Sequence, residues 1–170
     1  MNVLEERARQ LARAKSSSAK DGDSVELLRF QIAAERYALV TSVTHGVVRA
    51  DRIGILPGAP EHFRGILNLQ GEIVPLIDLS RVWRLERAAA GDEIRAVIVG
   101  AKHPEFALLI DAFDEIVQVA PAALQNAFAI DGQSEFVRGV LDDGSSLLDE
   151  RALLDDPRFF LNPEPQERNK

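Results

Sequence analysis

The strongest local signals of the chain lie in the stretch Phe63-Arg64-Gly65-Ile66-Leu67-Asn68-Leu69-Gln70-Gly71-Glu72-Ile73-Val74-Pro75-Leu76-Ile77-Asp78-Leu79. Two apolar runs, 65–69 and 72–77, are separated by Gln70-Gly71, a dipeptide that suits a two-residue hairpin turn. Asp78 follows the second run and has the short acidic side chain of a helix N-cap, so a short helix is expected over 79–85. The stretch predicts two hairpin strands followed by a capped helix.

The same pattern of short strands and turns continues on both sides of this hairpin. From residue 25 onward, short β-rich runs of four to eight residues alternate with Gly, Pro and Asp. The predicted strands are 26–33, 36–43, 46–49, 53–56, 65–69, 72–77, 95–100, 106–111, 114–119, 136–141 and 145–148. Further short helices are expected at 122–126, with Pro121 in the first turn, and at 150–154, capped by Asp149. Asp143-Gly144 predicts another hairpin turn.

An internal repeat links the two halves of this region. Sliding the sequence on itself places Tyr37-Ala38-Leu39-Val40 over Phe106-Ala107-Leu108-Leu109, and Arg64-Gly65-Ile66-Leu67 over Arg138-Gly139-Val140-Leu141. Asp78 and its helix likewise fall on Asp149 and its helix, after loop-sized gaps. Two similar β units, each marginal alone, are expected to share one large apolar interface.

The composition narrows the class of protein. Of the 170 residues, 46% are apolar, which suffices for a core, and the net charge of −7 argues against a nucleic-acid partner. The chain has no cysteine, and the three histidines share no ligand spacing, so no metal is expected. Neither a glycine-rich phosphate loop nor a nucleophile motif occurs, so neither a cofactor nor catalytic residues are expected.

The flanking segments differ from the β-rich region. Residues 1–15 have the apolar spacing of a helix, and 16–24 have the small polar residues of a flexible linker. The charged N-terminus lacks the apolar core of a secretory signal, and no apolar run approaches the ~20 residues that span a bilayer. A cytoplasmic protein without direct membrane insertion is therefore expected.

The hairpin stretch resembles the signature of the CheW family of chemotaxis coupling proteins, which reads Gly-x-x-Asn-Leu-Arg-Gly-x-x-x-Pro-x-x-Asp-Leu. The matching residues are Gly65, Asn68, Leu69, Gly71, Pro75, Asp78 and Leu79. The resemblance implies an all-β fold of two SH3-like five-stranded β-barrels packed side by side, with short helices and, here, an N-terminal helix. We expect a CheW-like domain over 25–157, with barrels at about 36–90 and 95–148. Strand 26–33 and the terminal helix would complete the pair, and 158–170 would form a C-terminal tail.

The resemblance also implies a non-enzymatic adaptor. Its partners would be the cytoplasmic tip of a methyl-accepting chemoreceptor and the regulatory domain of a CheA-type histidine kinase. Two departures stand out, because Gln70 replaces the family arginine, and Thr44 and Gly46 replace an apolar and an acidic residue at contact positions. The expected protein-binding residues are Thr44, Gly46, Gly65, Asn68, Gln70 and Gly71.

Two other interpretations stay open on the sequence. The chain could be a CheW-like scaffold of a different chemosensory complex. Less favoured is a small-ligand-binding protein or enzyme that uses the cleft between the two barrels. Such a site would need polar groups that converge in that cleft.

Overall fold

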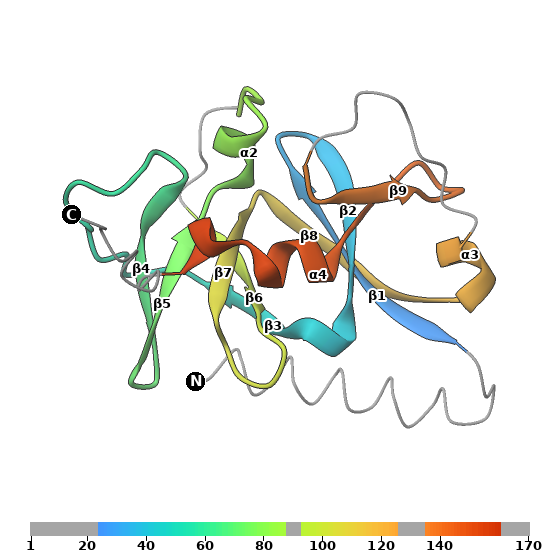
Figure 1. Cartoon of the computed structure of the whole chain (residues 1–170), viewed down its shortest axis with the longest axis horizontal. Helices are drawn as coiled ribbons and strands as arrows, with labels where there is room; N and C mark the ends of the chain where they lie inside the picture. Colours follow the sequence, from blue (N-terminus) through green and yellow to red (C-terminus); the bar gives the residue numbers. More distant parts are fainter. Residues whose placement is uncertain (1–23, 88–92, 126–134, 161–170) are drawn as a thin grey trace, which may run out of the picture.

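The computed structural model describes residues 24–87, 93–125 and 135–160, which form two five-stranded sheets with short helices (Figure 1). Sheet 1 has the strand order β8-β1-β2-β10-β9 and sheet 2 the order β3-β6-β7-β5-β4. The strands are β1 (Val25–Ile32), β2 (Glu35–Val40), β3 (Thr44–Arg49), β4 (Phe63–Leu69), β5 (Glu72–Ile77), β6 (Arg95–Val99), β7 (Phe106–Ile110), β8 (Ala112–Val119), β9 (Val137–Val140) and β10 (Ser146–Leu148). The helices are α2 (Leu79–Val82), α3 (Pro121–Gln125), α4 (Glu150–Asp155) and the 3₁₀ turns η1 (Thr41–Val43) and η2 (Pro157–Phe159). The predicted all-β fold class is confirmed.

The two sheets are built on one plan. In sheet 1 the central strand β2 pairs antiparallel with β1 and parallel with β10, and in sheet 2 β7 pairs antiparallel with β6 and parallel with β5. The runs that begin at Tyr37 and Phe106 therefore occupy equivalent central strands, as the repeat predicts. The capping residues Asp78 and Asp149 follow the equivalent strands β5 and β10.

The repeats exchange strands, and this overturns the predicted barrel boundaries of 36–90 and 95–148. β1 and β2 of the first repeat join β8, β9 and β10 of the second, while β6 and β7 join β3, β4 and β5. The parallel pair of β2 and β10 joins a strand of the first repeat to a strand of the second, so neither sheet is built from one repeat alone. At the first crossing η1 takes the chain out of sheet 1, and the Gly100 N–H donates to the Val43 carbonyl at 2.9 Å.

The strand exchange creates three apolar clusters. One lies between the sheets and includes Phe30 and Leu39 from sheet 1 and Val97 and Phe106 from sheet 2. The second cluster, which includes Ile98, lies inside sheet 2, and the third lies inside sheet 1. Central strands are thus buried on both faces, which explains why their sequences are continuous apolar runs instead of alternating ones.

Several element boundaries differ from the prediction. Strand 36–43 ends at Val40 because η1 follows it, and helix 79–85 ends at Val82, just before Arg84 adopts a φ of +56°. Segment 53–56 is not a strand, since only Gly54 pairs, in a single bridge with Ile66. The N-terminal helix 1–15, most of the linker 16–24, and Asn126 lie outside the described residues.

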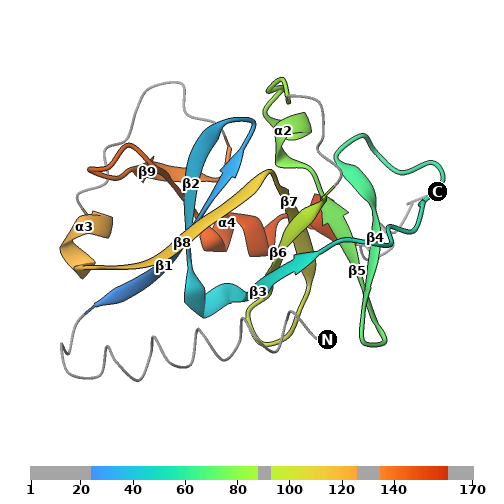
Figure 2. The same ribbon diagram turned by 180° about the vertical axis from the view of Figure 1, so that it is seen from behind.

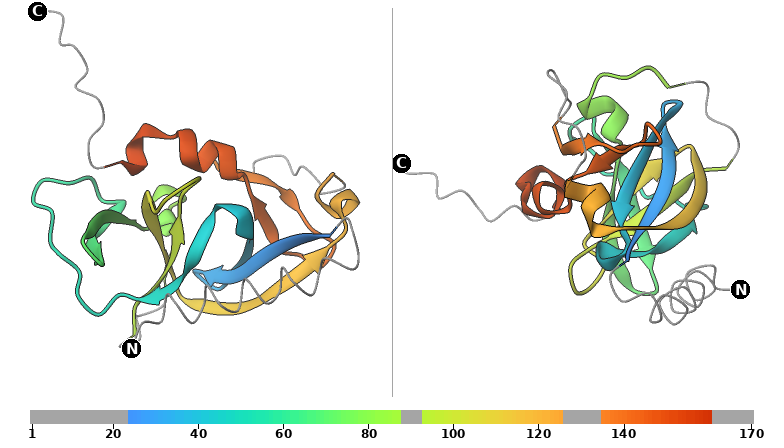
Figure 3. Two further views of the ribbon diagram at one scale, coloured as in Figure 1. Left: turned by 90° about the horizontal axis from the view of Figure 1, so that it is seen from below. Right: turned by 90° about the vertical axis from the view of Figure 1, so that its right-hand side faces the viewer.

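The C-terminal end of the domain crosses both sheets. α4 runs across the front of the molecule in Figure 1, and β1 and β8 lie on the opposite side (Figures 2 and 3). Beyond α4, Phe159 is fully buried, with its ring centroid 5.3 Å from that of Phe106 and 5.0 Å from that of Phe136. The predicted tail at 158–170 is therefore wrong at its start, because Phe159 belongs to the core between the sheets.

We expect Phe159→Ala to lower the free energy of unfolding by about 3–5 kcal/mol, because it removes a fully buried aromatic ring. Phe160→Ala is the matched control, since Phe160 is only partly buried and should cost clearly less. Urea unfolding monitored by circular dichroism gives both values. Equal losses for the two variants would contradict the core role of Phe159.

Candidate functional site

The signature stretch forms the β4–β5 hairpin as predicted. Gln70 (φ +54°) and Gly71 (φ +99°) occupy the turn, and two successive positive φ angles define the type I′ turn that matches strand twist. The Gly71 N–H donates to Asn68 Oδ1 at 2.7 Å, so the Asn68 side chain stabilises the turn. All three residues are exposed, and the hairpin projects from one end of the molecule (Figure 1).

Gly65 serves the backbone of the same hairpin. It is buried with a φ of +149°, and a Cβ there would overlap the carbonyl oxygen of Gly54 and the side chain of Ile53. Its neighbour Ile66 exchanges two backbone hydrogen bonds of 2.9 Å with Gly54. Gly65 therefore allows the segment after β3 to close against β4, and it offers no contact surface of its own.

Thr44 and Gly46 are also buried. Thr44 Oγ1 donates to the Thr41 carbonyl at 3.0 Å, which orders the exit from η1. Gly46 has a φ of +100° at the register shift between Thr44 and Val47, where β3 bulges against β6. β3 and β4 stand at opposite ends of the strand order of sheet 2. The structure thus places Asn68, Gln70 and Gly71 together as one exposed group, and it places Thr44, Gly46 and Gly65 in buried positions.

In the equivalent hairpin of sheet 1, β9–β10, an ion pair within the protein engages the turn. Arg29, whose side chain is only 14% exposed, forms ion pairs with Asp143 in that turn at 2.9 Å and with Glu115 on β8 at 3.1 Å. Burial alone would raise the pKa of Asp143, but hydrogen bonds from Ser145 and the charge of Arg29 outweigh it and hold the pKa below its usual range.

Sheet 2 has no counterpart of this ion pair at its hairpin. Arg29 pairs with Ala38 on β2, and the residue in the same position of sheet 2 is the fully buried Ile98, which pairs with Ala107 on β7. The Gln70 side chain has no hydrogen bond or ion pair among the residues that the structure describes. One turn is thus fixed by the protein itself and the other is free for a partner.

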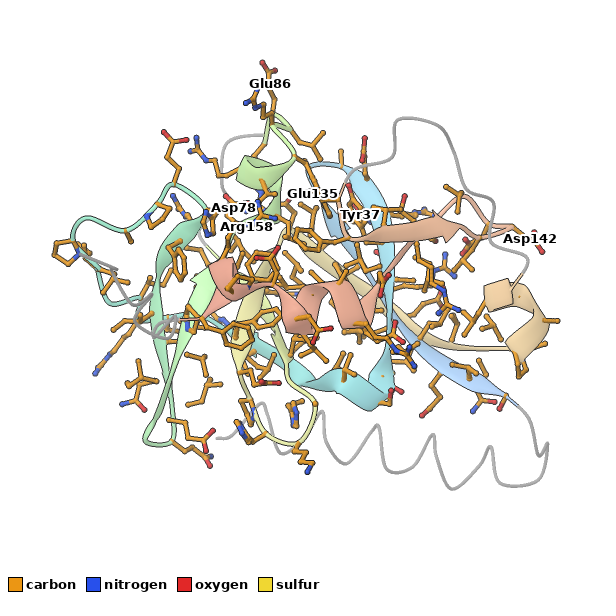
Figure 4. The ribbon with its side chains drawn as sticks, viewed as in Figure 1. Tyr37, Asp78, Glu86, Glu135, Asp142 and Arg158 are labelled. Atoms are coloured by element: carbon orange, nitrogen blue, oxygen red, sulfur yellow. The ribbon has the colours of Figure 1, made fainter. Side chains whose placement is uncertain are left out.

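The signature aspartate, Asp78, is buried and contributes to a charge network that reaches the surface at Asp111 and that the sequence did not reveal. Asp78 Oδ1 accepts from the Ser80 N–H at 3.0 Å and lies 3.5 Å from the Arg87 guanidinium. Arg87 also pairs with Asp111 at 3.3 Å, and Asp111 accepts from the Ala33 N–H at 2.6 Å. Figure 4 shows Asp78 at the centre of the molecule and Asp142, beside the Asp143 turn, at its far end. The network ties α2 to the junction of the two sheets.

Two hollows lie near η2. One, of about 430 Å³, is lined by β5, the β6–β7 loop and Phe160, and the other, of about 410 Å³, by residues 56–63 and 157–160. Within 24–87, 93–125 and 135–160, no group of three or more His, Asp or Glu side chains is arranged to hold a metal. No helix in these ranges is both long and apolar enough to cross a membrane.

Two five-stranded sheets that each contain strands of both repeats, and an exposed signature turn at the end of one sheet, are the features that define this fold. The chain matches the CheW-like domain family over residues 26–158. The chain belongs to the CheW family.

Named relatives and a solved structure agree with this family. The chain is 28% identical to a chemotaxis protein CheW of Treponema pallidum over 154 residues, which cover 87% of this chain and 89% of the relative. It is 30% identical to one of Rhizobium meliloti over 120 residues, covering 68% and 76%. The crystal structure of the scaffolding protein TtCheW from Thermoanaerobacter tengcongensis has a TM-score of 0.64 at 26% identity, covering 74% of this chain and 88% of that one. The chain is therefore a chemotaxis adaptor or scaffold and not an enzyme.

We expect Gly65→Ala to destabilise the protein much more than Gly71→Ala. Both glycines have positive φ, so both variants carry the backbone strain of about 1–3 kcal/mol, but only Gly65 has atoms where the new methyl group would lie. Thermal melting of the two variants separates these contributions. Equal melting temperatures would show that close approach at Gly65 is unimportant.

We expect Asp143→Asn to lower stability at neutral pH and to flatten the acid side of the stability curve. Because folding lowers the pKa of Asp143, its contribution is complete above about pH 5 and is lost as pH falls through the folded-state pKa. Asp142→Asn is the control, since Asp142 is exposed and forms no ion pair among the described residues. Urea unfolding between pH 3 and 7 tests this, and parallel curves for Asp143→Asn and the parent would refute it.

Proposed function

We propose that the chain couples the cytoplasmic tips of chemoreceptors to the regulatory domain of a CheA-type histidine kinase in the cytoplasm. The observation that carries the proposal is the free β4–β5 turn within the family signature. Its side chain at Gln70 is exposed and unengaged, whereas the equivalent turn at Asp143 is held by Arg29. Turns that project from a rigid sheet are suited to recognition, because the sheet fixes the position of the turn and the side chains of the turn face the solvent.

The residue at the tip of this turn gives the proposed site its particular chemistry. The family signature has an arginine where Gln70 stands, so a charged, bidentate donor is replaced by a neutral amide. A charge-assisted hydrogen bond contributes about 1.5–3 kcal/mol when well formed. We infer that the partner of this chain has lost the matching carboxylate, or that it binds more weakly at this point.

A CheW-like scaffold of a different chemosensory complex is the second candidate, and Gln70 is the observation in its favour. A changed residue at the centre of an exposed turn is what a changed partner would require. The two hollows near η2 lie beside sheet 2, so they do not supply the site in the cleft between the barrels that the ligand-binding alternative requires.

We expect Gln70→Arg to leave folding nearly unchanged, within about ±0.5 kcal/mol, because Gln70 is exposed in the hairpin turn. The same change should alter the affinity for the receptor fragment or the kinase domain. Isothermal titration of both proteins against each partner measures this, with Arg138→Gln on β9 as a control for a change of charge at a distant exposed site.

The outcomes separate the two parts of this proposal. Unchanged affinities for both partners would remove Gln70 from the binding site. A wild-type protein that binds neither partner would contradict the coupling function itself.

A further inference from the structure

The outer side of the β4–β5 hairpin is a surface that the signature turn does not include. Leu67 on β4 and Val74 on β5 point into the interior of sheet 2. Because side chains alternate along a strand, the residues on either side of Leu67 on β4 and of Val74 on β5 point outward. The outward set, here called the outer hairpin face, comprises Arg52, Arg64, Ile66, Asn68 and Ile73.

The segment before the hairpin adds a third row to this face. Gly54 and Ile66 exchange two backbone hydrogen bonds, and Ile53 packs against the interior cluster, so Arg52 and Gly54 face outward. The antiparallel register of that bridge places Arg52 beside Asn68, which in turn pairs with Ile73 on β5. Three adjacent backbone rows at about 4.8 Å spacing give a face about 10 Å wide, the width of one α-helix.

The middle of the face is apolar. The Ile66 side chain lies over Gly54, where a Cβ would come within 2.7 Å of Ile66 Cγ1. Ile73 is 48% exposed, although its neighbours Val74 and Pro75 are buried. The absence of a side chain at Gly54 therefore leaves room for the Ile66 side chain. Ile66 pairs across the hairpin with Pro75, and Ile73 lies diagonal to it on the same face of β5 as Pro75.

Two cations border these apolar residues. Arg52 and Arg64 are exposed, and neither forms an ion pair among the residues that the structure describes, although the chain carries a net charge of −7. Arg52 lies beside Asn68, and Arg64 lies four residues before Asn68 on β4. Along the strand direction the two arginines are therefore about 13 Å apart. In an α-helix that distance corresponds to about nine residues.

We infer that the outer hairpin face binds an acidic amphipathic helix of a partner protein. Its apolar side would lie on Ile66 and Ile73, and carboxylates between two and three turns apart would pair with Arg52 and Arg64. A partner strand is disfavoured there, because the outer edge of β4 already pairs with Gly54. The inference rests on the proposed function. In it, Arg52 and Arg64 provide the positive charge that the family arginine would carry at the position of Gln70.

The test is the affinity of Arg52→Glu, Arg64→Glu and the double variant for two probes, the cytoplasmic fragment of a chemoreceptor and the regulatory domain of a CheA-type histidine kinase. Each reversal should weaken binding of the receptor fragment by about tenfold, and the double variant should weaken it further and lose the salt dependence of the wild type. Binding of the kinase domain should stay within about twofold. Arg151→Glu, an equal charge change at an exposed position on α4, is the matched control and should change neither affinity.

A compensating change identifies the paired charge. Lysine in place of a carboxylate on the receptor fragment should restore binding to Arg52→Glu or Arg64→Glu, but not to Ile73→Ser. Receptor binding that survives the double reversal would overturn the inference while leaving the proposed function intact. Loss of kinase binding instead, or of self-association, would overturn it in favour of another occupant. A wild-type chain that binds neither probe would remove the proposed function, and the inference with it.

Discussion

Parallel pairing between strands of different repeats determines how both sheets and the core between them are built. β2 pairs with β10 and β5 pairs with β7, so neither sheet can form from one repeat alone. The exchange brings Phe30, Leu39, Val97 and Phe106 into one apolar cluster between the sheets. An apolar interface of this kind stabilises two units that are individually too small to bury much surface.

The exchange also decides where partners can bind. Since the central strands are buried on both faces, the described parts of the two sheets leave the hairpin ends and the outer faces of the edge strands accessible. The β4–β5 and β9–β10 hairpins lie toward opposite ends of the molecule (Figure 1). Arg29 fixes the second through Asp143, whereas the first keeps Gln70 free and is bordered by Arg52 and Arg64. Pseudosymmetry therefore gives two related hairpin ends, of which one is available for recognition.

The sequence predicted what depends on local chemistry. The turn at Gln70-Gly71, the caps at Asp78 and Asp149 and the alternation of strands each follow from a few neighbouring residues. The repeat correctly predicted that the runs at Tyr37 and Phe106 are equivalent strands. The strand exchange could not be predicted locally, because a continuous apolar run indicates a strand buried on both faces but does not identify the distant strand that pairs with it.

The candidate site was only partly predictable for the same reason. Resemblance selected Thr44, Gly46 and Gly65 by position, but their burial depends on η1 and on the Gly54 bridge, which are tertiary features. The sequence predicted Phe159 to be part of a C-terminal tail, whereas the chain beyond α4 places it in the core between the sheets. Arg87 connects Asp78 to Asp111 across a distance in sequence that no motif covers.

We propose that one chain bridges a receptor and a kinase. Sedimentation of the purified kinase with receptor cytoplasmic fragments displayed on vesicles, with and without this protein, tests this bridging. We expect the kinase to sediment with the vesicles in proportion to the added adaptor and to stay in the supernatant in its absence. If the adaptor bound to the vesicles at saturation and the kinase still remained in the supernatant, the bridging claim would be wrong.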